Sequence, residues 1–404
     1  MSGWMRLAKR LMTMQSKPLP AMPRSVWALG FVSMFMDISS EIVHALLPLF
    51  LTVSLGVSVA MVGLIDGVAE STAQIAKVFS GYVSDRIGRR KPLILLGYAL
   101  AALSKPLFAF ADGAMLVLGA RFADRIGKGL RGAPRDALIA DVTPAAIRGR
   151  AYGLRQALDT VGAFIGPLLA MALMALFAND FRAVFWVAFI PALIAVLVVA
   201  VGVQDRAAPP NSAPRAPIRF TDLRRLDRGF WRVVAIGVVI ALARFSEAFL
   251  ILKAVAEGLP LALAPLVLVV MNLVYALSAY PAGALADSWR PRDLLLVGLA
   301  LLIGADLALA TGLAGAFVGV ALWGGHMAMT QGLLAKLVAE RTPDELRGSA
   351  FGLFNLATGV AMLGASVVAG LMWDGVSPQA TFLAGAGFAA AACLMLVAQP
   401  KAAG

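Results

Sequence analysis

Reactive and charged side chains are scarce in this chain of 404 residues. Its one cysteine, Cys393, excludes an internal disulfide and supports no metal–thiolate site. Charged residues make up only 14% of the sequence while hydrophobic residues make up 60%, which is outside the range of soluble domains. The sequence also has no glycine-rich loop of the kind that cradles phosphates in nucleotide hydrolases. We therefore expect a membrane protein that has no cofactor and does not use ATP.

Long hydrophobic stretches recur along the whole sequence. Each has roughly 20 residues, which is enough to cross about 30 Å of hydrocarbon. The stretches show no alternation with a period of two, so they predict helices rather than a transmembrane barrel. We expect an all-α membrane protein with about twelve membrane helices, near residues 26–54, 57–83, 93–111, 114–138, 149–176, 182–202, 231–254, 260–286, 292–312, 315–339, 349–372 and 379–398.

Basic residues predict the orientation of these helices. Lys and Arg gather before the first helix and after every even-numbered one, whereas the opposite loops hold only Arg182. Basic loops stay in the cytoplasm, so both termini are expected there, in a multi-pass protein of the inner membrane. The net charge of +12 follows from this bias and predicts no nucleic-acid partner. The expected partners are the lipid bilayer, protons and a small-molecule substrate, and the chain is expected to be a monomer.

Polar segments divide the chain into two similar halves. We predict a cytoplasmic arm at 1–25, a six-helix bundle at 26–203, a linker at 204–230, a second six-helix bundle at 231–398 and a tail at 399–404. The segment TPAAIRGRAYGL at 143–154 resembles TPDELRGSAFGL at 342–353, which indicates an internal repeat. Repeated bundles of this kind rock against each other around a site near the middle of the membrane.

Several ionisable residues lie inside the hydrophobic stretches. At membrane depth such groups are costly unless they are paired or line water, so they mark a transport pathway. The candidates for a substrate cavity lie mainly in the first and fourth predicted helices, with others in the seventh and tenth: His44, Arg121, Asp124, Arg125, Lys128, Arg244, Glu247, His326 and Gln331. No role is predicted for Asp66, Glu70, Lys77, Lys105, Asp159 or Asp306.

Asp37 and Glu41 are the candidates for proton coupling. With His44 they occupy one face of the first predicted helix, at spacings i, i+4 and i+7. Burial disfavours the charged form of a carboxylate and a nearby arginine favours it, so a carboxylate between these influences can load and release a proton. The competing interpretation is a static network of salt bridges with the fourth helix.

The loop after the second predicted helix carries a family resemblance. GYVSDRIGRRKPL at 81–93 resembles the loop 2–3 signature of the major facilitator superfamily, and the likeness extends over essentially the full chain. It implies two pseudo-symmetric six-helix bundles and a latch that holds the cytoplasmic side shut, with Asp85 near Arg347. The second copy keeps Gly283 and Asp287 but continues as Ser288-Trp289-Arg290-Pro291-Arg292-Asp293, so it does not carry the full signature. The latch residues by resemblance are Gly81, Asp85, Arg86, Gly88, Arg89 and Arg90.

The fifth predicted helix suggests a direction of transport. It resembles the antiporter motif of the superfamily's exporters, although Ala170 and Met171 stand where two glycines are usual. Small residues on one face permit close helix packing, and this is also the structural alternative to a functional motif. The matching positions are Gly153, Gly162, Gly166 and Pro167.

The fourth predicted helix bears on the substrate. Its segment from Arg125 to Gly129 resembles the signature of drug–proton antiporters, with Lys128 in place of the usual glutamine and Arg131 in place of a glycine. The resulting cationic character suits a solute with a carboxylate or phosphate. Alternatively, Arg131 and Arg135 reach the cytoplasmic surface or pair with nearby acids.

Together these features predict a secondary transporter that is not an enzyme. We expect alternating access and proton-coupled export of a small charged or amphiphilic organic solute, a drug or a metabolite, that can be anionic. Two alternatives are uptake by proton symport and export of a divalent metal or metal chelate through Asp37, Glu41 and His44, although no resident metal is predicted. A membrane enzyme or sensor would need a nucleophile–base pair or an added soluble domain, and neither is found in the sequence.

Overall fold

The computed structural model describes residues 20–87, 89–205, 226–330, 333–343 and 346–398, and its regular secondary structure in these ranges is helical. The all-α fold that the hydrophobic stretches predicted is confirmed. The first half of the chain forms α2 (Arg24–Leu49), a π-helical turn (Phe50–Ser54), α3 (Val59–Ile87), α4 (Lys91–Phe110), α5 (Ala114–Val142), α6 (Arg148–Leu176) and α7 (Phe181–Gly202). A short 3₁₀ turn at Ala145–Ile147 precedes α6.

The second half repeats this plan with more interruptions. It forms α8 (Arg228–Ala243), α9 (Ala248–Ala256), a 3₁₀ turn (Leu261–Leu263), α10 (Leu266–Ser288), α11 (Pro291–Leu309), α12 (Leu313–Thr330), α13 (Leu333–Glu340), α14 (Arg347–Gly375) and α15 (Pro378–Val397). Side chains cap the amino-terminal ends of several helices. Asp227 accepts a hydrogen bond from the Phe230 amide at α8, and Ser377 accepts one from the Ala380 amide at α15.

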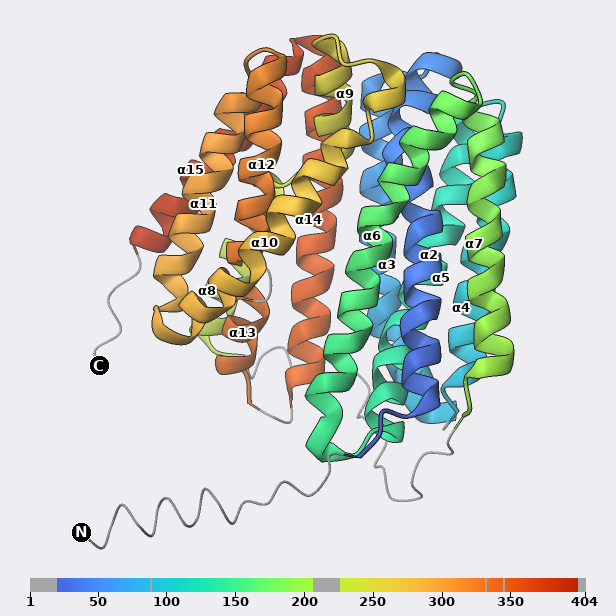
Figure 1. Ribbon diagram of the computed structural model, residues 1–404. Coiled ribbons are helices and arrows are strands. Elements are labelled where there is room, and N and C mark those ends of the chain that lie inside the picture. Colours follow the sequence, from blue (N-terminus) through green and yellow to red (C-terminus); the bar gives the residue numbers. More distant parts are fainter. Residues whose placement is uncertain (1–19, 88, 206–225, 331–332, 344–345, 399–404) are drawn as a thin grey trace, which may run out of the picture.

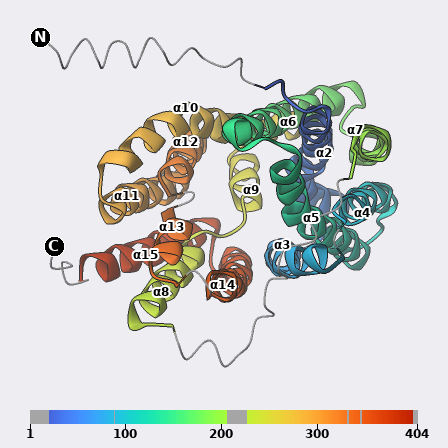
Figure 2. The same cartoon turned by 90° about the horizontal axis from the view of Figure 1, so that it is seen from below.

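The helices form two groups that stand side by side (Figures 1 and 2). In the first group α2 packs on α6 and α7, and α5 packs on α3 and α4. In the second, α12 packs on α10 and α11, while α8 packs on α14 and α15. The main contact between the groups joins α3 to α14, with smaller contacts between α6 and α10 and between α2 and α9. The exact domain boundaries stay a prediction.

Within the described residues, ten helical spans are long and apolar enough to cross a membrane. The remaining two predicted stretches correspond to α5, with 29 residues, and α11, with 19. Both are long enough to span, but each holds more than two charged residues, including Arg121 and Asp124 in α5 and Asp306 in α11. α5 packs against α3 and α4, and α11 packs against α12 and α15, so both belong to the helix bundles.

The seventh predicted helix is broken, which the sequence analysis did not foresee. α8 ends at Ala243 and α9 begins at Ala248, and the four residues between them are not α-helical. Neither proline nor glycine lies in this break, so the usual signal is missing. Instead, the amide of Ser246 donates a hydrogen bond of 3.2 Å to Ser366 Oγ of α14, because a backbone group freed from a helix inside the membrane must find another partner.

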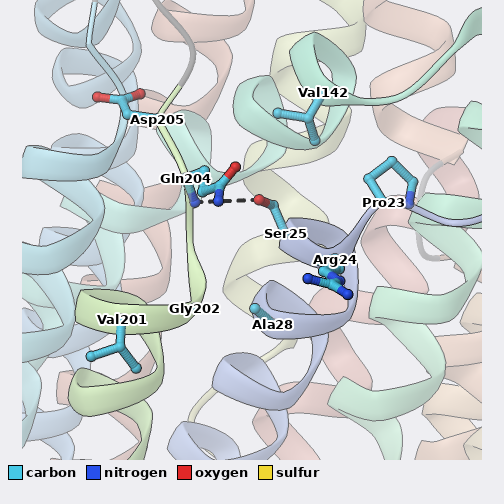
Figure 3. A pocket seen from close by; sticks show the side chains of 9 residues that line it. All are labelled: Pro23, Arg24, Ser25, Ala28, Val142, Val201, Gly202, Gln204 and Asp205. Atoms are coloured by element: carbon cyan, nitrogen blue, oxygen red, sulfur yellow. Dashed lines mark hydrogen bonds between the residues drawn. The ribbon is translucent and has the colours of Figure 1, made fainter.

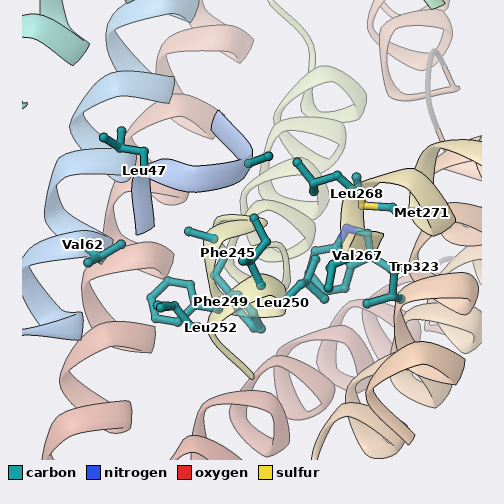
Figure 4. Packing of buried hydrophobic residues seen from close by; sticks show 14 of the residues in the cluster. Leu47, Val62, Phe245, Phe249, Leu250, Leu252, Val267, Leu268, Met271 and Trp323 are labelled. Atoms are coloured by element: carbon teal, nitrogen blue, oxygen red, sulfur yellow. The ribbon is translucent and has the colours of Figure 1, made fainter. Parts of the chain in front are cut away.

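One hydrophobic core is shared by both groups of helices. Its buried members include Leu47 and Val62 from the first half, and Phe249 and Trp323 from the second (Figure 4). Phe245, at the break between α8 and α9, stacks edge-on against Phe249 with ring centroids 5.5 Å apart. The broken segment is therefore held by packing on one side and lies at the contact between the halves.

Candidate functional site

The two candidate proton-coupling residues lie where α2 packs on α6. A β-carbon placed on Gly162 would lie 2.5 Å from the carbonyl oxygen of Met34 and 3.1 Å from Cβ of Asp37. A β-carbon placed on Gly166 would lie 2.6 Å from Cβ of Glu41. Two of the antiporter-motif glycines thus face the two acidic residues one turn apart, and their lack of a side chain allows the close approach of the helices.

Asp37 and Glu41 have different neighbours. Asp37 lies within electrostatic range of Asp159 of α6, and Asp159 also lies 3.7 Å from Nη2 of Arg155. Glu41 instead lies 3.6 Å from Nδ1 of His44, and both of these side chains are partly exposed. Asp37 thus has an acidic neighbour in another helix, whereas the neighbour of Glu41 is a histidine of its own helix.

Buried salt bridges occupy much of the charged run in α5. Asp124 accepts a hydrogen bond of 2.8 Å from Nζ of Lys105 in α4, and Nε of Arg125 lies 3.7 Å from its other oxygen. Arg125 Nη1 lies 3.1 Å from Oε1 of Glu70 in α3. Because Lys105 and Asp124 are almost completely buried, their charges hold α4 and α5 together rather than face a solute.

Arg121 makes a further buried pair. Its Nη2 lies 3.3 Å from Oδ1 of Asp66 in α3, and the two side chains are exposed by only 2% and 4%. The other oxygen of Asp66 accepts a hydrogen bond of 2.7 Å from Oγ of Ser246 in the second half. The sequence placed Arg121 in the substrate cavity because it shares a helix face with Arg125, but its partners came from helices that the wheel could not identify.

Lys128 differs from the other basic residues of α5 near it. Its side chain is exposed, and no hydrogen bond or ion pair joins it to another described residue. It lies within electrostatic range of Asp37, Glu41 and Glu70. Further along the helix, the guanidinium of Arg131 lies 4.7 Å from the centre of the Tyr98 ring. Among the described residues of α5, Lys128 is therefore a cation available for a solute.

The second half adds charges at the break between α8 and α9. Arg244 and Glu247 are the first and last residues of this break, and both side chains are partly buried. Glu247 is within electrostatic range of His44, Glu41 and Glu70, which belong to the other half. Broken helices of this kind place backbone and side-chain polar groups at transporter binding sites. The structure thus brings charges from both halves to one region.

The other candidates of the second half lie elsewhere. His326 is completely buried, and its Nδ1 lies 2.8 Å from the carbonyl oxygen of Gly298, so its ring is used to join α11 and α12. Asp306 is also completely buried, and neither carboxyl oxygen has a hydrogen-bond partner among the described residues. Gln331 lies outside the described residues.

The proposed latch is only partly described. Gly88 and the side chains of Asp85 and Arg347 lie outside the described residues, so their contact stays a prediction. Gly81 comes close to α5, because a β-carbon there would lie 3.5 Å from that of Ala133, and Arg86 and Arg89 are exposed. Arg90 is nearly buried: Nη1 donates a hydrogen bond of 2.6 Å to Ser84 Oγ, and Nε lies 3.5 Å from Asp141.

Two observations limit other kinds of site. In the part of the chain that the structure describes, no three His, Cys, Asp or Glu side chains are grouped so as to hold a metal ion, which leaves the metal alternative without a ligand set there. A groove of about 700 Å³ lies at the ends of α2, α5 and α7, where Ser25 Oγ accepts a hydrogen bond from the Gln204 amide (Figure 3). Its lining includes Arg24 and Asp205 but none of the candidate site residues.

Comparisons with known proteins identify related membrane proteins. An uncharacterized MFS-type transporter of Methanocaldococcus jannaschii is 28% identical over 383 residues, which cover 93% of this chain and 94% of that protein. Multidrug resistance protein MdtH of Yersinia enterocolitica is 32% identical over 203 residues, which cover 50% of this chain and 47% of MdtH.

Solved transporters share the fold at much lower identity. The nucleoside transporter NupG has a TM-score of 0.77 and 13% identity, over 92% of this chain and 99% of its own. A POT family transporter in complex with 5-aminolevulinic acid also has a TM-score of 0.77, with 12% identity over 96% and 97% of the two chains. The model of the Major Facilitator Superfamily matches residues 29–357 and 234–403. The chain therefore belongs to the major facilitator superfamily of membrane transporters.

Proposed function

We propose that this transporter works by alternating access and exports a small organic solute in exchange for protons. The observation that carries the proposal is the packing of Asp37 and Glu41 against Gly162 and Gly166, with the exposed Lys128 within electrostatic range of both acids. Proton-binding groups and solute-binding groups would thus share one charged region between the halves. The antiporter-like glycines and the similarity of half the chain to a multidrug resistance protein support export.

Coupling follows from the sign of the charge on the solute. The partly exposed carboxyl groups of Glu41 and Glu247 offer sites for a positive group, and Lys128 and Arg244 offer sites for a negative one. A positive group that pairs with Glu41 favours the charged carboxylate and displaces a proton. Solute and proton then compete for the protein, which is the thermodynamic requirement for exchange in opposite directions. We therefore propose a cationic or zwitterionic solute, often amphiphilic, for the export mode.

A purely anionic solute would couple in the other direction. Its binding to Lys128 would bring a negative charge close to Glu41 and Asp37 and offset the positive charge of the lysine. Proton binding to the two carboxylates would then become more favourable. Solute and proton would then bind together, as in uptake by symport. The exposure of Lys128 is the observation that favours this second candidate function.

Proton release on binding distinguishes the two functions. The purified protein would be screened by thermal shift against cationic, zwitterionic and anionic organic compounds, and each stabilising compound would be added in weak buffer with a pH-sensitive dye. We expect the stabilising compounds to carry a positive group and to release protons. Stabilisation by anions alone, with uptake of protons, would contradict export and establish the symport alternative.

A vesicle assay then tests the direction. Proteoliposomes with an acidic lumen would receive the labelled ligand outside, and an exchanger should accumulate it inside as protons leave. The Lys128→Ala variant serves as a control for the role of the cation. It should still exchange a purely cationic ligand, whereas a zwitterionic ligand should bind more weakly because it loses one ion pair.

A further inference from the structure

Asp66 is a charged residue to which the sequence assigned no role, yet it is bonded across the contact between the halves. Its carboxylate is shared between Arg121, in its own half, and the hydroxyl of Ser246, in the other half. Asp66 is only 3% exposed, so water does not compete effectively for these bonds. One oxygen of Asp66 is thus bound within its own half and the other is bound to the second half. A movement of one half relative to the other would change the second bond.

The segment that carries Ser246 is held in place from both sides. Its amide donates to Ser366 Oγ of α14, and its Oγ also accepts a hydrogen bond of 3.1 Å from the Ala248 amide at the start of α9. These bonds exist because the helix is interrupted between Ala243 and Ala248. Within the break, Ser246 is therefore hydrogen-bonded to α3 through its hydroxyl and to α14 through its amide.

Close backbone packing surrounds this connection. A β-carbon placed on Gly67 of α3 would lie 3.1 Å from Cα of Leu363, and one placed on Gly63 would lie 3.2 Å from the ring of Phe249. One turn nearer the start of α3, the amides of Val59 and Ala60 donate to the carboxylate of Asp374 at the end of α14. The two halves are thus in close contact along the first third of α3, with Asp66 at the inner edge.

We propose that Asp66 is the positioning residue of an inter-half gate formed by Asp66, Arg121, Ser246 and Ser366. The bond from Ser246 Oγ to Asp66 joins the two halves at the end of the molecule where α3 begins, the bond to Ser366 fixes Ser246 within its own half, and the pair with Arg121 orients Asp66. Opening at this end breaks the bond to Ser246 and leaves the pair with Arg121 intact. The gate rests on the proposed alternating access, but not on the identity of the solute or on proton coupling.

Spin labels can measure the opening directly. Val53, in the turn before α3, and Val376, just after α14, are 55% and 74% exposed and would be replaced by cysteine in a Cys393→Ser background. Distances between the labels would be measured without ligand. A hydrogen bond to a charged group contributes enough that its loss in Ser246→Ala should increase the ratio of open to closed molecules roughly tenfold.

Two controls make the measurement specific. Ser104→Ala removes a buried hydroxyl that bonds only to the carbonyl of Ala101 in its own helix, so it should leave the distances unchanged. Ser246→Thr keeps a hydroxyl and should restore the closed distance. If Ser246→Ala gives the same distribution as Ser104→Ala, the gate is wrong. If Ser246→Ala does not fold, Asp66→Ala, which removes the acceptor of the same bond, must show the same opening or the gate is likewise wrong.

The outcome is independent of the ligand experiments. A gate that opens in Ser246→Ala, in a protein whose ligands release no protons, would refute proton exchange and leave the gate standing. Unchanged distances in a protein that exchanges solute for protons would refute the gate and leave proton exchange standing.

Discussion

Gly166 of α6 packs directly on Glu41 of α2, so closely that a β-carbon on the glycine would lie 2.6 Å from that of the glutamate. One turn earlier, Gly162 has the same relation to Asp37. The glycines of the antiporter-like motif and the two candidate proton-coupling acids are therefore parts of one helix contact. A change in how α6 packs on α2 would therefore move both acids.

Substitution of Gly166 tests whether the contact between α6 and α2 excludes a side chain. We expect Gly166→Ala to lower the free energy of unfolding by about 1–3 kcal/mol, because the added carbon overpacks a close helix contact. Thermal unfolding in detergent would measure this. Gly153→Ala is the matched control, since Gly153 belongs to the same motif but has nothing within 4 Å of its added carbon. Equal effects of the two substitutions would contradict the packing argument.

Asp124 should matter far more for stability than Asp306, although both are buried carboxyl groups. Asp124→Asn leaves the buried ammonium of Lys105 without its partner, which should cost about 3–5 kcal/mol. Asp306 has no hydrogen-bond partner among the described residues, so Asp306→Asn should cost less than about 1 kcal/mol. Chemical denaturation monitored by tryptophan fluorescence would compare them. A larger loss in Asp306→Asn would show that this carboxyl has a structural partner in the folded protein.

Lys128 should affect ligand binding without affecting stability. Its side chain is exposed and makes no ion pair with a described residue, so Lys128→Gln should change the free energy of unfolding by less than about 0.5 kcal/mol. Affinity for a ligand with a carboxylate should fall by about threefold to tenfold, measured by calorimetry. Lys105→Gln, which removes the partner of Asp124, should show the opposite pattern, with loss of stability first. Unchanged affinity in Lys128→Gln for every anionic or zwitterionic ligand would exclude this lysine from the site.

Asp37 should be needed for coupling but not for movement of the solute. In proteoliposomes, Asp37→Asn should abolish accumulation driven by a pH gradient, because the side chain can no longer release a proton. Exchange of labelled for unlabelled solute across the membrane should continue, since Glu41 and Lys128 remain in place. Accumulation against a gradient in Asp37→Asn would move proton coupling to another acid, with Glu41 as the next candidate.

Several features could be predicted from the sequence because they depend on neighbouring residues in the chain. Hydrophobic stretches of membrane length predicted the helices, since the bilayer imposes the same requirement on every span. The charged segment that forms α5 was also counted among these stretches, at 114–138. The periodicity of a helix also placed Asp37 and Glu41 on one face.

The partners of the charged residues were decided only by the tertiary structure. Arg121, Arg125 and Lys128 share a face of α5, and nothing local distinguishes them. Arg121 is paired with Asp66 and Arg125 with Glu70, whereas no ion pair with a described residue occupies Lys128. Each pairing depends on α3, which reaches α5 through packing in the bundle rather than through proximity in the chain.

The break between α8 and α9 shows the same division. Its residues read as part of one apolar span, because length and hydropathy describe only the cost of leaving water. The interruption is stabilised by Ser366, 120 residues away, and by Asp66, 180 residues away, which supply hydrogen bonds that the helix would otherwise make within itself. Hydrophobicity along the chain determined that this protein spans a membrane; the pairing of polar groups between distant helices decided which charges hold the bundle together and which are left for transport.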